Sequence, residues 1–278
     1  MSSEQKPKNS YVGIDLIRRL VSEEVRIFSI NQARNMSSKV GIKESYLGEA
    51  LYHLRRNGWI IPLRRGLYVI SQSVPGTSPI HEFEIAMNLV DPAAISHWSA
   101  LSYHGLTDQT PRKVFVSTPS RSVPRVRRAT TERAIDGYAV GETVYQFIQM
   151  KPMRFFGSER VWIGDAQVMI TDPERTLLDG LSMPHYCGDF SEVIQAFRIR
   201  ERDLDIDKLI DYALRLDTVI AKRLGWILES IGYEGAGLAR LTQVSIKGYR
   251  KLDPTGPRKG RCNRRWKILE NLPGMVTA

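Results

Sequence analysis

Two adjacent arginines, Arg64 and Arg65, lie between two short β-prone runs and directly precede Gly66. Glycine readily adopts the positive φ of a tight hairpin, so both guanidinium groups are expected at a hairpin tip. Guanidinium groups bind phosphates through paired hydrogen bonds, although exposed arginines in turns are more often simply solvated. Whether the arginine pair binds phosphate must therefore be judged together with the element that precedes it.

A helix is predicted immediately before the hairpin, because Gly58 can end it and because Leu47, Leu51 and Leu54 recur at helical spacing. These leucines would form one buried stripe. Polar side chains on the first turns of such a helix can meet base edges or the sugar-phosphate backbone in a major groove. The residues left on or near the opposite face are Ser45, Tyr46, Glu49, Tyr52 and His53.

Two further helices are expected upstream, because residues 11–21 show helical spacing and Ser29 can cap a second helix. Three helices followed by a hairpin over 59–70 are typical of a winged helix-turn-helix, whose hairpin reaches the neighbouring minor groove or backbone. Arg55 and Arg56 can either clamp a phosphate or favour the negative end of the helix dipole, and both interpretations stay open. The residues predicted to bind DNA are Lys43, Ser45, Tyr46, Glu49, His53, Arg55, Arg56, Arg64, Arg65 and Tyr68.

Charge is distributed unevenly along the 278 residues, whose formal net charge is +10. Residues 1–75 carry 12 Lys/Arg against 6 Asp/Glu, and residues 235–278 carry 10 against 2, whereas residues 76–234 carry 18 against 22. Two basic ends favour binding to nucleic acid through phosphate neutralisation, with an affinity that falls steeply as salt rises.

The sequence predicts a soluble cytoplasmic protein. Its only two cysteines, Cys187 and Cys262, lie in different segments, which does not fit a disulfide framework. The first ten residues lack the apolar core of a signal peptide, and no run approaches 18 apolar residues. We therefore expect no membrane partner.

The middle of the chain is expected to form a mixed α/β body. Its short β-prone runs are 114–117, 144–148 and 168–170. Helices are predicted over 96–105, from the N-cap Asp172 onward, and over 190–199, 204–216 and 219–231.

Changes in composition predict where the chain divides. Residues 71–79 form a Ser/Pro/Gly/Thr cluster typical of a linker, and residues 232–237 contain three glycines. The expected fold class is α+β multidomain, with an N-terminal winged helix-turn-helix followed by a mixed α/β domain that has a helical C-terminal part. The predicted domains are a DNA-binding domain over 1–72, an α/β effector domain over 80–232, and a loosely held basic arm over 235–278.

One group of residues resembles a hydrolase triad. Its members are Ser96, His97, Ser99 and His104, with Asp91 and Asp108 nearby. No Gly-x-Ser-x-Gly elbow surrounds any of these serines, and a capped helix with a packed face explains the group better.

A second group faintly resembles the core of a metal-dependent nuclease, and consists of Asp165, Gln167, Asp172 and Glu174. Asp172 and Glu174 are already explained as a helix start, however. His185 and Cys187 are too few ligands for zinc. The sequence therefore predicts no enzymatic activity, no metal and no cofactor.

The order of short motifs resembles the AbiEi family, the antitoxins of AbiE abortive-infection toxin–antitoxin systems. The motifs are LRRGLY (63–68), ISHWSALSYHGL (95–106), RFFG (154–157), ITDPERTLLD (170–179) and RLGWILE (223–229). The resemblance spans about residues 11–232, and residues 235–278 have no counterpart in it.

This resemblance implies a protein that binds inverted repeats in its own promoter and represses it. It also implies an effector domain that counters a nucleotidyltransferase-like toxin encoded beside it, either by direct contact or without a stable complex. Inverted repeats call for two copies of the reader, so self-association on DNA is implied. The alternatives are a winged-helix regulator whose second domain senses a ligand or partner, and a nuclease that acts on DNA.

Overall fold

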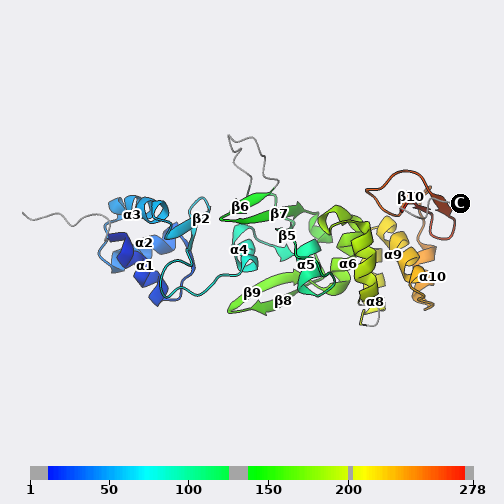
Figure 1. Ribbon diagram of the computed structural model, residues 1–278, viewed down its shortest axis with the longest axis horizontal. Coiled ribbons are helices and arrows are strands. Elements are labelled where there is room, and N and C mark those ends of the chain that lie inside the picture. The colour runs from blue at the N-terminus through cyan, green and yellow to red at the C-terminus, as the bar shows by residue number, and fades with distance from the viewer. Residues whose placement is uncertain (1–11, 125–136, 200–202, 273–278) are drawn as a thin grey trace, which may run out of the picture. The chain divides into compact units, whose positions relative to one another are not determined.

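The structure is a computed structural model of a mixed α+β protein (Figure 1). No helix in the described part of the chain is both long enough and apolar enough to cross a bilayer. The described residues are 12–124, 137–199 and 203–272.

The chain forms two compact units, and the first of them is discontinuous in sequence. The first unit takes its described residues from Met1–Leu89 and Pro124–Thr143. The second takes them from Val90–Val123 and Val144–Ala278.

Three helices and a three-stranded antiparallel sheet form the N-terminal part of the first unit. The sheet has the order β1-β3-β2. This arrangement fits a winged helix-turn-helix, with one strand that the sequence analysis missed, β1. The elements are α1 (Val12–Ser22), β1 (Ile27–Ser29), α2 (Ile30–Lys39), α3 (Glu44–Arg56), β2 (Ile60–Arg64) and β3 (Leu67–Ile70).

Local signals explain these helices. Ser29 and Gln32 form a capping box, in which the Ser29 hydroxyl accepts from the Gln32 amide at 3.2 Å and the Gln32 side chain accepts from the Ser29 amide at 2.8 Å. The leucine stripe of α3 is buried, with Leu47, Leu51 and Leu54 each 4–5% exposed. Both features confirm the sequence analysis.

Two elements from outside the first 72 residues complete the first unit. They are α4 (Glu82–Leu89) and β6 (Tyr138–Val140), and both contact β2. The Tyr138 hydroxyl donates to the carbonyl of Leu63. The wing is therefore supported by residues far from it in sequence.

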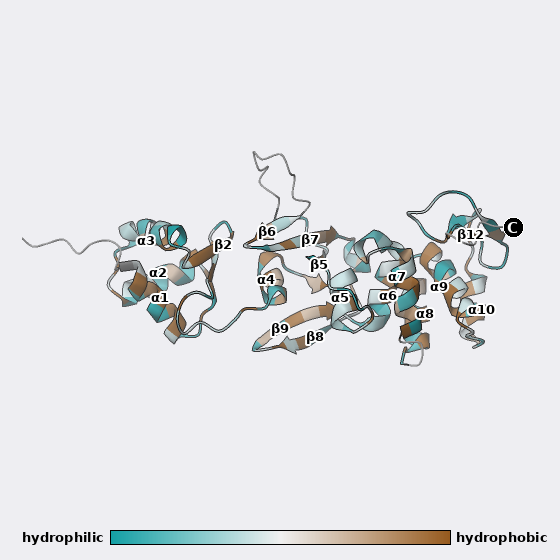
Figure 2. Ribbon diagram, viewed as in Figure 1, coloured by the Kyte–Doolittle hydropathy of each residue, from teal (hydrophilic) through white to brown (hydrophobic). Residues whose placement is uncertain are grey.

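The second unit contains a mixed sheet, whose strands within this unit have the order β7-β5-β4-β9-β8. Neighbouring strands are parallel in the pairs β5–β7 and β4–β9 and antiparallel in the pairs β4–β5 and β8–β9. Figure 2 shows β9 in hydrophobic colours, in keeping with its mostly buried side chains. The strands are β4 (Ala94–Ile95), β5 (Lys113–Thr118), β7 (Thr143–Gln149), β8 (Ser158–Ile163) and β9 (Ala166–Thr171).

The helices of the second unit largely follow the predicted spacing. Asp172 caps α6 by accepting from the Arg175 amide at 2.8 Å, and Pro173 takes the first helical position. The predicted helices over 96–105, 190–199, 204–216 and 219–231 are confirmed as α5, α7, α8 and α9, within two residues at each end. The helices are α5 (His97–Tyr103), α6 (Pro173–Ser182), α7 (Phe190–Ile199), α8 (Ile206–Leu216), α9 (Thr218–Ser230) and α10 (Gly237–Gln243), with single 3₁₀ turns at Pro152–Arg154 and Pro184–Tyr186.

The segment after Gly235 corrects the sequence analysis, because it is packed rather than loosely held. It forms α10 and a small sheet with β12 (Ile268–Glu270) between β10 (Arg250–Lys251) and β11 (Arg261–Asn263). Trp266 is fully buried against α9, where a Cβ at Gly225 would lie only 2.0 Å from its ring. The apolar residues that anchor this segment lie in short elements and in the loops between them, so no long periodic pattern revealed them. They are Leu238, Leu241, Leu252, Trp266, Ile268 and Leu272.

Candidate nucleic-acid interface

The outer face of α3 is polar and aromatic. With the leucine stripe turned into the core, a period of 3.6 residues places Ser45, Glu49 and Tyr52 on the opposite side. Tyr52 is 59% exposed and Tyr46, which flanks it, is 52% exposed. Each exposed tyrosine offers a ring and a hydroxyl group that can contact bases or the sugar-phosphate backbone. This face is the strongest candidate for contacting a groove.

The N-terminal end of α3 is open to solvent. Lys43 occupies the N-cap position without a side-chain cap, and its side chain is exposed. The following residue, Glu44, forms an ion pair with Arg34 of α2 at 2.7 Å. This pair joins the two helices of the helix-turn-helix at the point where the turn brings them together.

The C-terminal half of α3 adds further charge. His53 is half-buried, with its Nε2 3.8 Å from Glu49 Oε1 and its ring edge-on to Tyr52 at 5.4 Å. Arg55 and Arg56 are exposed in the last turn. Their positions suit either of the two roles that the sequence left open, phosphate binding and interaction with the helix dipole.

The wing is a hairpin whose tip is Arg65 and Gly66. Arg64 is the last residue of β2 and pairs with Leu67, and Gly66 has the predicted positive φ of 75°. The Gly66 carbonyl accepts from the Ile30 amide at 2.8 Å, which ties the tip to the start of α2. Both arginines are exposed, as expected.

Arg64 is partly positioned by the protein itself. Its Nε donates to the carbonyl of Asn88 in α4 at 3.4 Å, a long bond that orients the guanidinium group. It also lies near Tyr138, whose pKa is raised by burial and lowered to a smaller extent by Arg64. Sequence reasoning missed Asn88 and Tyr138, because nothing in the local pattern signals a partner dozens of residues away.

Tyr68 differs from the other predicted contacts. It is half-buried, its ring stacks on Phe28 at 5.6 Å between centroids, and it packs against the core of the first unit. Its observed contacts therefore stabilise the wing sheet.

The serine and histidine group of the hydrolase alternative lies inside the second unit. His97 is fully buried with its Nδ1 2.9 Å from Ser96 Oγ, while Asp91 and Asp108 are exposed at the surface. Burial lowers the pKa of His97 from its ordinary 6.5 to about 4, against the opposing effect of Asp179. Ser99 and His104 bond to backbone atoms, and His104 Nε2 lies 2.7 Å from the Thr171 carbonyl. These are packing roles.

The two acids at the start of α6 are engaged in ion pairs. Lys208 lies 3.1 Å from Asp172 and 2.8 Å from Glu174. Burial alone would lower the pKa of Lys208, but the hydrogen bonds that it donates to Glu174 and Asp172, with the charges of these carboxylates, outweigh burial and raise the pKa. Among the described residues, no group of three or more His, Cys, Asp or Glu side chains is arranged to hold a metal ion.

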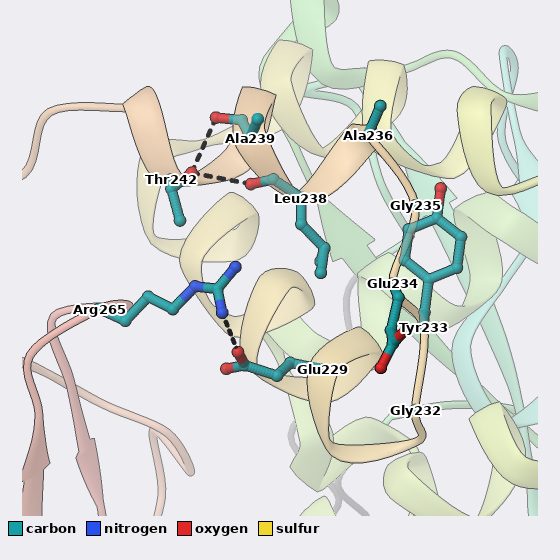
Figure 3. Close-up of a pocket in the computed structure, with 10 residues that line it drawn as sticks. All are labelled: Glu229, Gly232, Tyr233, Glu234, Gly235, Ala236, Leu238, Ala239, Thr242 and Arg265. Atoms are coloured by element: carbon teal, nitrogen blue, oxygen red, sulfur yellow. Dashed lines mark hydrogen bonds and ion pairs between the residues drawn. The ribbon is translucent and has the colours of Figure 1, made fainter.

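A pocket of about 450 Å³ opens in the second unit between the end of α9, the following loop and α10 (Figure 3). Arg265 forms an ion pair with Glu229 on one side, and Leu238 points into the space between Arg265 and Tyr233. Its lining residues lie between 229 and 242 except for Arg265, and the sequence analysis gave no sign of this pocket.

Comparison with known proteins supports the reading of the first unit. Residues 15–71 match a family described as "Transcriptional regulator, AbiEi antitoxin". No curated protein matches the chain. The crystal structure of the RV2827C protein from Mycobacterium tuberculosis is similar in fold, with a TM-score of 0.69 over 94% of this chain and 92% of that chain at 14% identity. The segment that contains the three helices and the wing is therefore similar to AbiEi transcriptional regulators.

Proposed function

We propose that the protein is the antitoxin of an AbiE-like toxin–antitoxin system and represses its own promoter. The observation that carries this proposal is the exposed face of α3 beside an arginine-tipped wing, within the segment that matches the AbiEi family. The exposed arginines and the aromatic residues of α3 supply phosphate-binding and base-contacting groups on one small domain.

In the proposed mode of binding, α3 enters the major groove and its outer face contacts base edges. Ser45 and Tyr46 lie on its first turns, where a recognition helix reads sequence. Glu49 can accept a hydrogen bond from a cytosine amino group. Arg64 and Arg65 bind the neighbouring backbone or minor groove, and Lys43, Arg55 and Arg56 add phosphate contacts at the helix ends.

The second unit would carry the antitoxin activity, as the family resemblance implies. Its target would be a nucleotidyltransferase-like toxin encoded by a neighbouring gene. Inverted repeats in the promoter would each hold one copy, so two copies of the protein would sit on one operator.

A gel-shift assay with the DNA upstream of the gene tests the regulatory half of the proposal. We expect retention of this fragment at protein concentrations that leave a scrambled fragment free. Equal retention of both fragments would contradict operator recognition.

Co-expression with the neighbouring gene tests the antitoxin half. We expect the neighbour to arrest growth when it is expressed alone and this protein to restore growth. Arrest that persists despite operator binding would favour a second candidate, a winged-helix regulator that senses a small ligand. The pocket beside α10 supports that alternative, because its volume suits a small molecule and both charged and apolar groups line it.

A further inference from the structure

Seven exposed cations gather on the small C-terminal sheet and its loops. Residues 235–278 contain 10 Lys/Arg against 2 Asp/Glu. Within the described part of the chain, none of the seven forms an ion pair. We call these seven the C-terminal basic surface: Lys247, Arg250, Arg258, Lys259, Arg261, Arg264 and Lys267.

The two acids of this segment are half-buried and hydrogen-bonded. Asp253 is half-buried and accepts from the amide and hydroxyl of Thr255 at 2.7 and 2.6 Å. Glu270 is half-buried and accepts from the indole of Trp226 at 2.8 Å and from the amide of Asn263 at 2.9 Å. Both carboxylates accept from neutral donors, and among the described residues neither forms an ion pair with the seven cations, so the segment keeps a large positive excess.

The cations are displayed on a fixed surface. The central strand, β12, is held by buried Ile268, and the turn before it is held by Trp266, whose indole donates to Glu229 at 2.5 Å. Arg250 and Arg261 lie on the two outer strands, where they pair with Ile268 and Glu270 of β12, two residues apart. Charges on a packed sheet lose less conformational freedom on binding than charges on a mobile arm.

We propose that the C-terminal basic surface is a second binding site for duplex DNA, which it holds through phosphates without reading sequence. Cations crowded on one surface repel one another, and a bound polyanion reduces this repulsion. Four of the seven cations are arginines, whose planar guanidinium groups suit phosphate oxygens. The proposal does not depend on α3 recognising an operator.

Cys262 offers a direct test with the unmodified full-length protein. It lies exposed in β11 beside Arg261, whereas the other cysteine, Cys187, is buried and burial raises its pKa well above the ordinary value. N-ethylmaleimide should therefore alkylate Cys262 selectively. We expect a 30-base-pair DNA duplex of random sequence, in low salt, to slow this alkylation at least threefold.

Polyglutamate at the same charge concentration serves as the probe for an acidic protein partner. An unchanged rate of alkylation with DNA would overturn the proposal, whether or not polyglutamate protects Cys262. Protection by duplex RNA of the same length without protection by DNA would overturn it as well.

A matched pair of variants tests the cations themselves. The first replaces Arg258, Lys259, Arg261 and Arg264 with glutamine, and the control replaces four exposed cations elsewhere in the second unit with glutamine. The control residues are Arg112, Lys151, Arg160 and Arg198. Both variants lose the same formal charge, and within the described part of the chain none of the eight side chains is buried, hydrogen-bonded or ion-paired.

The readout is the salt dependence of binding to the random duplex. Each lost phosphate contact lowers the slope of log K against log salt by about 0.9. We expect the first variant to lose about two to four units of slope and the control to lose less than one. Equal slopes for the two variants would overturn the proposal. Operator recognition is tested separately by the gel shift, so its failure can be told apart from a failure of this proposal.

Discussion

At the scale of single residues, the two wing arginines differ in how the protein holds them. The guanidinium group of Arg64 is oriented by the Asn88 carbonyl, whereas Arg65 stands at the hairpin tip with Gly66. Both are expected to bind phosphates, and the bond to Asn88 restricts the side chain of Arg64. Ordered cations lose less entropy on binding.

Replacing Arg64 and Arg65 with alanine should weaken binding to every DNA sequence. Each lost phosphate contact should lower the salt slope by about one unit, because fewer counterions are released. Fluorescence anisotropy at several salt concentrations measures this effect, with Arg18→Ala on the exposed face of α1 as a control for general charge. Unchanged affinity of the double variant would remove the wing from the proposed mode of binding.

His97 should make the second unit sensitive to acid. Its folded pKa of about 4 lies below the unfolded value of 6.5, so the unfolded state takes up a proton first as the pH falls. The stability from this residue is therefore complete above pH 6.5 and is lost between pH 6.5 and 4, to a total of about 3 kcal/mol.

The substitution His97→Asn tests this, because asparagine tolerates the left-handed backbone at this position, where φ is 50°. We expect urea unfolding of the variant to depend less on pH between 7.5 and 4.5 than that of the original protein. If the unfolding free energies of the two proteins changed equally with pH, the neutral imidazole of His97 would not be the cause of the acid sensitivity.

At the scale of elements, α2 depends on its cap. Ser29→Ala removes the acceptor for the Gln32 amide and should destabilise the first unit by about 1 kcal/mol. The matched control is Ser38→Ala, an exposed serine within the same helix. Urea denaturation followed by circular dichroism measures both, and an equal effect of the two changes would argue against the capping role.

The first turns of α3 should determine sequence preference. Tyr46→Ala should change which operator positions are tolerated, because base contacts discriminate by about 1–3 kcal/mol each. Selection from a randomised operator library compares the variant with the Arg64/Arg65 double variant, for which the preferred sequence should persist. An unaltered preference after Tyr46→Ala would place sequence reading elsewhere.

Features that depend on residues close together in the sequence could be predicted from it. Contacts between residues far apart in the sequence could not. The leucine stripe of α3 and the caps Ser29 and Asp172 depend on residues within one or two turns, so spacing revealed them. The tie between Tyr138 and Leu63 spans 75 residues, and no periodicity encodes it. Most exposed residues of the candidate interface were likewise predictable, whereas the packing of Tyr68 on Phe28 required the sheet.

At the scale of the whole molecule, Trp266 joins the C-terminal sheet to the core of the second unit. Trp266→Ala should destabilise that unit by about 3–5 kcal/mol, because it empties a fully enclosed site against Gly225. Trp162→Ala is the control, since its side chain is 65% exposed on β8 and its loss should matter little. Thermal denaturation distinguishes the two, and similar melting temperatures would contradict the anchoring role.

The position of Trp266 near the end of the described chain also affects when the second unit can fold during translation. Domains commonly fold in order as the nascent chain emerges from the ribosome. The core of the second unit, however, includes Trp266, Ile268 and Leu272, so it cannot be completed until these last residues have emerged. Nonsense mutations that remove even the last dozen of the described residues are therefore expected to yield a degraded product, however intact the upstream reading frame.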